Sequence, residues 1–163
     1  MIQRIQTVWL AIICMLCIAG LCSDVAYYTS EGNTVAEFSN FTFSAEGAFK
    51  EMDCTGPWTL GVLLILVFLT SLVSLLLFRK RMRQLRLCVF SSILLLGYIG
   101  VYAFFAYVYL LKLDTFDSGA SESVGFHLSV AAIYPVLCLI LNALAIHGIR
   151  KDEALVRSLD RLR

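Results

Sequence analysis

Four long runs without a charged residue constrain the fold of this chain most strongly. With histidine counted as neutral, they cover residues 5–23, 54–78, 87–111 and 123–149. A helix needs about 20 apolar residues to cross the hydrocarbon core of a bilayer. The span must be helical because lipid offers the backbone amides no hydrogen-bond partner. The runs therefore predict four membrane-spanning helices and leave no room for a fifth, with bounds near residues 5–22, 58–78, 87–111 and 126–149.

The composition supports the same class of protein. The 163 residues are 60% hydrophobic and 15% charged, whereas a soluble domain is about 45–50% apolar and about 25% charged. We predict an all-α membrane protein with one domain, residues 1–163. It would be a four-helix transmembrane bundle that carries a small extracytoplasmic β-hairpin and a short C-terminal amphipathic helix. The net charge of +1 argues against a nucleic-acid partner.

A block of basic residues between the second and third runs predicts the orientation. Lys and Arg close to spanning helices stay on the cytoplasmic side of the membrane. We therefore place an inner loop at residues 79–86 and both termini in the cytoplasm, which puts eleven of the 13 basic residues inside. The block would also contact anionic lipid headgroups. Its members are Arg79, Lys80, Arg81, Arg83 and Arg86.

The first outer loop, residues 23–57, reads as strand material. β-Branched and aromatic residues at 25–30 and 34–43 flank Glu31-Gly32-Asn33, which is a hairpin signal. Within the second strand, Phe41 and Phe43 are predicted to share one face. A lone hairpin is marginally stable in water, so its apolar face should pack on the helix ends, the outer leaflet or a partner.

The remaining segments carry weaker signals. The second outer loop, residues 112–125, is acidic and rich in Ser and Gly, so we expect it to be mobile. Pro135 is expected to kink the fourth span. The tail, residues 150–163, has apolar residues at helical spacing and would either lie on the inner leaflet or dock a partner. The candidate docking residues are Leu155, Arg157, Leu159 and Arg161.

Few polar groups fall inside the predicted spans. Tyr98 and Tyr102 are four residues apart on one helix face, and Asn142 lies in the fourth span. Buried phenols need hydrogen-bond partners. We treat Tyr98, Tyr102 and Asn142 as a candidate intramembrane polar cluster, which serves either helix packing or a pocket.

Two pairs among the six cysteines have notable spacing. Cys14 and Cys17 have the separation of a redox dithiol. The pair lies below the predicted membrane surface, so we interpret both thiols as small buried apolar groups. Cys22 and Cys54 lie at the outer ends of adjacent spans, where an oxidising compartment would allow a disulfide bond.

The two ends of the chain carry a family resemblance. Residues 1–10 (MIQRIQTVWL) and 149–163 (IRKDEALVRSLDRLR) resemble the terminal sequences of a family of small four-span inner-membrane proteins of Gram-negative bacteria, catalogued as a domain of unknown function. The resemblance implies a bacterial inner-membrane location and the same topology, but no activity. The layout is also similar to that of claudins, although their tryptophan-and-paired-cysteine motif is missing.

No catalytic, cofactor-binding or metal-binding motif stands out in the sequence. We favour a non-enzymatic structural or assembly subunit of a membrane complex, in contact with membrane lipids and a membrane-protein partner. The alternative is a membrane enzyme, or a lipid- or quinone-binding protein with an intramembrane site. A transporter is disfavoured because the spans contain no charged residue and the chain has no internal repeat.

Overall fold

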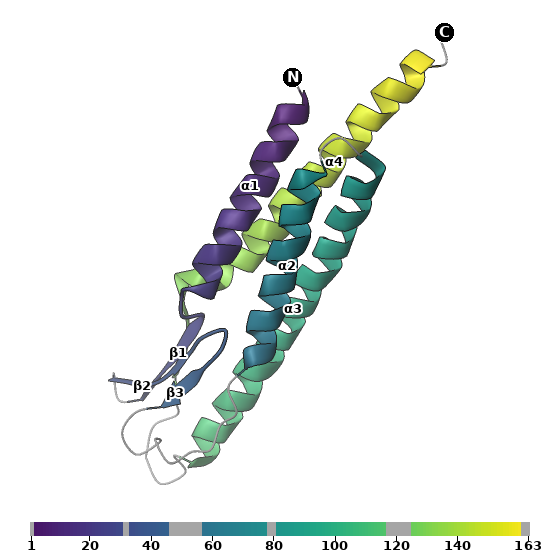
Figure 1. Cartoon of the computed structure of the whole chain (residues 1–163). Helices are drawn as coiled ribbons and strands as arrows, with labels where there is room; N and C mark the ends of the chain where they lie inside the picture. Colours follow the sequence, from purple (N-terminus) through teal and green to yellow (C-terminus); the bar gives the residue numbers. More distant parts are fainter. Residues whose placement is uncertain (1, 31–32, 46–56, 78–80, 117–124, 161–163) are drawn as a thin grey trace.

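Four helices dominate the part of the chain that the structure describes (Figure 1). A computed structural model describes residues 2–30, 33–45, 57–77, 81–116 and 125–160. Each helix lies beside two others, since α1 contacts α2 and α4, and α3 also contacts α2 and α4. The helices are α1 (Ile2–Leu21), α2 (Trp58–Leu76), α3 (Arg81–Phe116) and α4 (Tyr134–Asp160).

Three stretches of the described residues are long and apolar enough to cross a membrane. They are Trp58–Leu76, Met82–Leu113 and Val130–Ala154, and α1 contributes the shorter apolar stretch Thr7–Leu21. Large apolar side chains cover the outward faces as well as the core: Ile93, for example, is 60% exposed. A helix that is apolar on all sides suits a membrane or a large protein core.

The predicted hairpin is confirmed, but it is part of a larger antiparallel sheet. Strands β1 and β2 pair as expected, and β3 and β4 extend the sheet to the order β3-β2-β1-β4. The fourth strand comes from the segment just before α4, so the sheet joins the first predicted outer loop to the predicted start of the fourth span. The strands are β1 (Ala26–Ser30), β2 (Asn33–Phe38), β3 (Phe43–Ala45) and β4 (Gly125–Leu128).

The predicted strand over residues 34–43 is interrupted by a tight turn at Ser39–Thr42. The N–H of Ser39 donates to the carbonyl of Thr42 at 2.9 Å, and the N–H of Thr42 donates to the Ser39 hydroxyl at 3.1 Å. Such side-chain bonds compete with the strand ladder. Phe41 therefore lies in the turn and Phe43 in β3, so the prediction that they share a strand face is wrong.

The helix bounds correct three further predictions. Helix α3 runs to Phe116 instead of ending at 111, and it begins at Arg81, inside the predicted basic loop. Residues 126–128 form a strand, and the short 3₁₀ helix η2 (Val130–Ile133) precedes α4. Pro135 lies in the first turn of α4, directly after η2, and the predicted kink at this residue stays a prediction.

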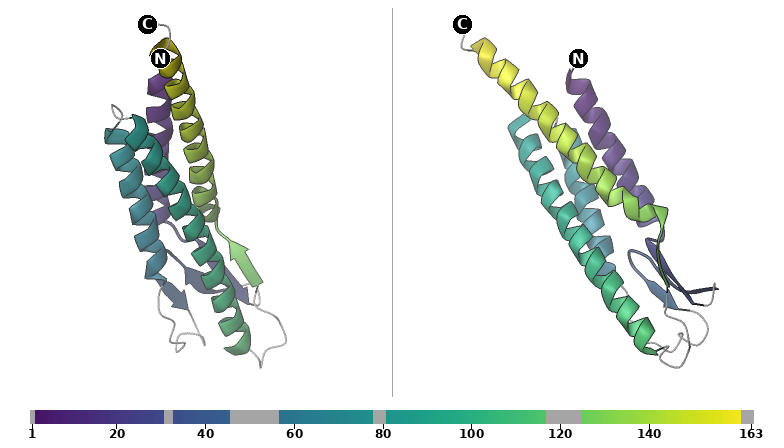
Figure 2. Two further views of the ribbon diagram at one scale, coloured as in Figure 1. Left: turned by 90° about the vertical axis from the view of Figure 1, so that its right-hand side faces the viewer. Right: turned by 180° about the vertical axis from the view of Figure 1, so that it is seen from behind.

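The last part of α4 replaces the separate amphipathic helix predicted for the tail. Helix α4 continues without interruption through residues 150–160. It projects beyond α1 and the ends of α2 and α3 (Figures 1 and 2). The N-terminal end of α1 and the C-terminal end of α4 lie at the end of the molecule opposite to the sheet (Figure 1).

Candidate functional site at the helix–sheet junction

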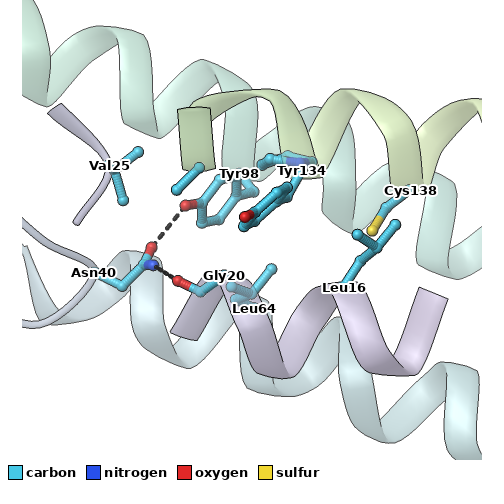
Figure 3. Close-up of a pocket in the computed structure, with 10 residues that line it drawn as sticks. Leu16, Gly20, Val25, Asn40, Leu64, Tyr98, Tyr134 and Cys138 are labelled. Carbon is cyan, nitrogen blue, oxygen red and sulfur yellow. Dashed lines mark hydrogen bonds between the residues drawn. The ribbon is translucent and has the colours of Figure 1, made fainter. Parts of the chain in front are cut away.

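Asn40, in the turn between β2 and β3, connects three helices, and Figure 3 shows its bonds to two of them, through Gly20 and Tyr98. Its Nδ2 donates to the carbonyl of Gly20 near the end of α1 at 2.7 Å. Its Oδ1 accepts a hydrogen bond from the Tyr98 hydroxyl of α3 at 2.6 Å. Its backbone carbonyl accepts from the N–H of Gly61 in the first turn of α2 at 3.0 Å, which satisfies one of the amides that a helix start leaves open.

Both side chains of the Asn40–Tyr98 hydrogen bond are buried, so loss of this bond would destabilise the fold. Asn40 is 1% exposed and Tyr98 is 2% exposed. A buried polar group without a partner loses its solvation and costs roughly 1–3 kcal/mol. The sequence predicted Tyr98 as part of a polar cluster, whereas Asn40 was not predicted. The only available signal was its position beside Ser and Thr in a turn-forming context, which is common for exposed Asn as well.

The inner face of the sheet packs on the C-terminal half of α3 through aromatic rings. Phe38 stacks on Tyr102 with ring centroids 5.8 Å apart, and Phe43 stacks on Tyr109 at 4.4 Å. The Tyr28 hydroxyl donates to the carbonyl of Ala106 at 3.0 Å. An isolated hairpin is marginally stable in water. We expect these contacts with α3 to stabilise the β1–β2 hairpin and the sheet around it.

Burial also affects the chemistry of Tyr28. Loss of solvent raises the pKa of its phenol well above the ordinary value, and the nearby phenols of Tyr102 and Tyr109 raise it further. The phenol therefore remains a protonated donor to Ala106 at every physiological pH. The Tyr102 hydroxyl is buried and has no hydrogen-bond partner among the described residues.

Two hollows lie beside the Asn40–Tyr98 bond. The smaller has a volume of about 10 Å³ and is lined by groups that include Gly20, Asn40, Tyr98 and Cys138 (Figure 3). That volume is close to the minimum for one water molecule.

The larger hollow is a groove between α3 and the β4–η2–α4 segment. Its volume is about 520 Å³, which falls in the range of ligand pockets, roughly 300–1,000 Å³. Tyr98 and Tyr102 form one wall, and Val130, Ile133 and Val136 belong to the other. The lining is mostly apolar, and the last three side chains are also exposed on the molecular surface.

The third member of the predicted polar cluster has separate hydrogen-bond partners. Asn142 Nδ2 donates to the carbonyl of Cys88 at 2.8 Å and to the Ser92 hydroxyl at 3.0 Å. These bonds join α4 to the N-terminal part of α3, whereas Tyr98 bonds to the sheet turn. Tyr98 and Tyr102 line one groove, and Asn142 is not among the residues that line it.

The other predicted site residues are only partly described. Arg83 and Arg86 are exposed on the first turns of α3. For Arg81 the structure describes the backbone but not the side chain. Leu155, Arg157 and Leu159 lie on the α4 extension, likewise without described side chains. The predictions that concern Arg79, Lys80 and Arg161 fall outside the described residues.

The cysteines near the junction differ in exposure. Cys22 is exposed and forms no disulfide bond with another described cysteine. Cys54 lies outside the described residues, so a bond between Cys22 and Cys54 stays a prediction. Cys14 and Cys17 are buried. Within the described ranges, no group of three or more His, Cys, Asp or Glu side chains is arranged to hold a metal ion.

These features define a small helical protein with membrane-length apolar helices, joined at one end to an antiparallel sheet that has four strands among the described residues. The chain belongs to the family described as Domain of unknown function (DUF4293), which it matches over residues 2–162. No curated protein matches it.

Proposed function

We propose that all four helices span a bacterial inner membrane, with the sheet outside and both chain ends in the cytoplasm. Helix α1 has the shortest apolar stretch, but it lies directly beside α2 and α4. A bilayer that surrounds its two neighbours therefore surrounds α1 as well. The orientation rests on the basic residues, which concentrate at the end away from the sheet.

Within that membrane, we propose a non-enzymatic structural or assembly subunit. The observation that carries this proposal is the extension of α4, which projects beyond the other helices at the basic end (Figure 2). The described polar groups in the helix interior support it, because they are uncharged amides, hydroxyls and thiols that bond mostly to neighbouring helices or to their own helix. We place the docking site for a membrane-protein partner on the extension, at Leu155 and Leu159.

Affinity purification of the full chain in mild detergent tests this proposal. We expect a stoichiometric partner, and we expect the double substitution Leu155→Ser and Leu159→Ser to reduce its recovery about five-fold or more, since losing one strong contact costs more than about 1 kcal/mol. Ala154→Ser, on the exposed side of the same helix, serves as the control and should retain the partner. A stable monomer or a pure homo-oligomer from wild-type membranes would contradict the proposal.

A second candidate function, binding of a lipid chain, is favoured by the groove between α3 and α4. Its apolar wall and its volume of about 520 Å³ suit the hydrocarbon chain of a membrane lipid. The occupant would enter sideways from the bilayer, since Val130 and Ile133 are 71% and 53% exposed.

A bulky side chain in the groove tests this second candidate. Ile133→Trp should fill part of the groove and lower the amount of lipid per chain that survives purification by about half or more, as measured by mass spectrometry of extracted lipid. Ile93→Trp is the matched control, because Ile93 is 60% exposed and does not line the groove. Equal lipid content in the two variants would exclude the groove as the site.

A further inference from the structure

The groove between α3 and the β4–η2–α4 segment has an uncharged lining. None of the described residues that border it carries a charge at neutral pH, and the polar side chains among them are those of Tyr98, Tyr102 and Ser129. Moving an unpaired ion from water into such surroundings is costly. A phosphate or ammonium group is therefore disfavoured inside the groove, whereas the uncharged part of a lipid fits there.

The wall of this groove includes a phenol whose hydroxyl has no partner. Of three tyrosines at the junction between α3 and the sheet, Tyr98 donates to Asn40, and Tyr28 donates to a backbone carbonyl of α3. The Tyr102 hydroxyl is buried without a hydrogen-bond partner among the described residues, while its side chain borders the groove. A buried donor without an acceptor is unfavourable. A small shift of the ring toward the groove would let this hydroxyl donate to a bound lipid.

The depth of Tyr102 in the proposed bilayer indicates which lipid group accepts that bond. Tyr102 lies about 24 Å along α3 from Arg86, at the helical rise of about 1.5 Å per residue. Arg86 is the last charged residue before the long uncharged run. Because the hydrocarbon core is about 30 Å thick, Tyr102 lies just below the outer boundary of the core. The ester carbonyls that join acyl chains to glycerol lie at this boundary.

We propose that the groove holds one acyl chain of an outer-leaflet glycerolipid, and that the Tyr102 hydroxyl donates a hydrogen bond to the ester carbonyl of that chain. The inference rests on the lipid-binding function proposed above and adds the group by which the lipid is recognised. The chain runs from the carbonyl toward Ile99, which also lines the groove and lies deeper in the membrane. The headgroup stays outside, so the protein selects the ester linkage and not the headgroup.

A competition between ester and ether lipids tests the inference. The purified full chain in neutral detergent receives equal amounts of a phosphatidylcholine with two ester-linked hexadecanoyl chains and its analogue with two ether-linked hexadecyl chains, which lacks the carbonyl oxygens. Native mass spectrometry separates the two complexes by mass. We expect the ester complex to be about three- to ten-fold more abundant, as one uncharged hydrogen bond would give. Replacing the headgroup of both lipids by phosphatidylglycerol should leave this ratio unchanged.

Two tyrosine variants assign the preference to one hydroxyl. Tyr102→Phe should make the two complexes equally abundant, because it removes the donor and keeps the ring that stacks on Phe38. Tyr107→Phe is the matched control, since Tyr107 is 62% exposed on the same helix and is not among the residues that line the groove. This control should keep the wild-type ratio. Ile133→Trp should lower both complexes alike.

Equal amounts of the two complexes in the wild type, or a preference that Tyr102→Phe leaves intact, would overturn the inference. If Ile133→Trp still lowered the amount of bound lipid, the lipid-binding function would stand without it. If the wild-type chain bound neither lipid, both would fail. The wild-type ratio decides the question even if a variant fails to accumulate.

Discussion

Replacing Asn40 by alanine should lower the free energy of unfolding by about 3 kcal/mol, the largest effect that we expect from one substitution. The change removes the acceptor of the Tyr98 hydroxyl and the donor to the Gly20 carbonyl. Both partners then remain in a region without solvent, and each unpaired group costs roughly 1–3 kcal/mol. Equilibrium unfolding in mixed micelles measures the loss.

A pair of tyrosine variants separates the hydrogen bond from general disturbance of the junction. Tyr98→Phe removes one hydroxyl and leaves Asn40 with one unsatisfied acceptor, so we expect a loss of about 1–2 kcal/mol. Tyr107→Phe changes a side chain that is 62% exposed on the same helix, and it should change the stability by less than about 0.5 kcal/mol. An effect below about 1 kcal/mol for Asn40→Ala would show that the turn does not hold the helices together.

The sequence located the helices well because each of them contains a long uncharged run. A long uncharged run in a bilayer can only be a helix, and the locations of all four helices followed from the charges at their ends. The same reasoning failed at residues 126–128. They are apolar and continuous with the fourth run, so their hydropathy does not distinguish the end of a helix from a strand that pairs with β1.

The candidate site was less predictable because its contacts join distant segments. Tyr98 was identified since a phenol in the middle of an apolar run needs a partner. Nothing in the sequence assigned that role to Asn40, 58 positions away. Local spacing describes one helix face, but it carries no information on which helix packs there.

A second large effect is expected from Gly61→Ala in the first turn of α2. A methyl group built on Gly61 would overlap the ring of Phe41, which covers this glycine from the Ser39–Thr42 turn. The ring is 42% exposed and can move outward, but the Gly61 N–H also donates to the Asn40 carbonyl, so the turn and the helix cannot separate freely. Overpacking of this kind costs roughly 1–3 kcal/mol, and we expect about 2 kcal/mol.

A double-mutant cycle identifies Phe41 as the cause of that loss. In a Phe41→Ala background the added methyl group meets no ring, so Gly61→Ala should cost less than about 0.5 kcal/mol, with a coupling energy of about 1–2 kcal/mol. Gly97→Ala on α3 is the matched control, because nothing lies within 4 Å of the added carbon. Alanine also favours a helix over glycine by roughly 0.5–1 kcal/mol, so this variant should be at least as stable as the wild type. A similar loss at Gly61 with and without the Phe41 ring would mean that α2 itself, and not its contact with the turn, requires glycine.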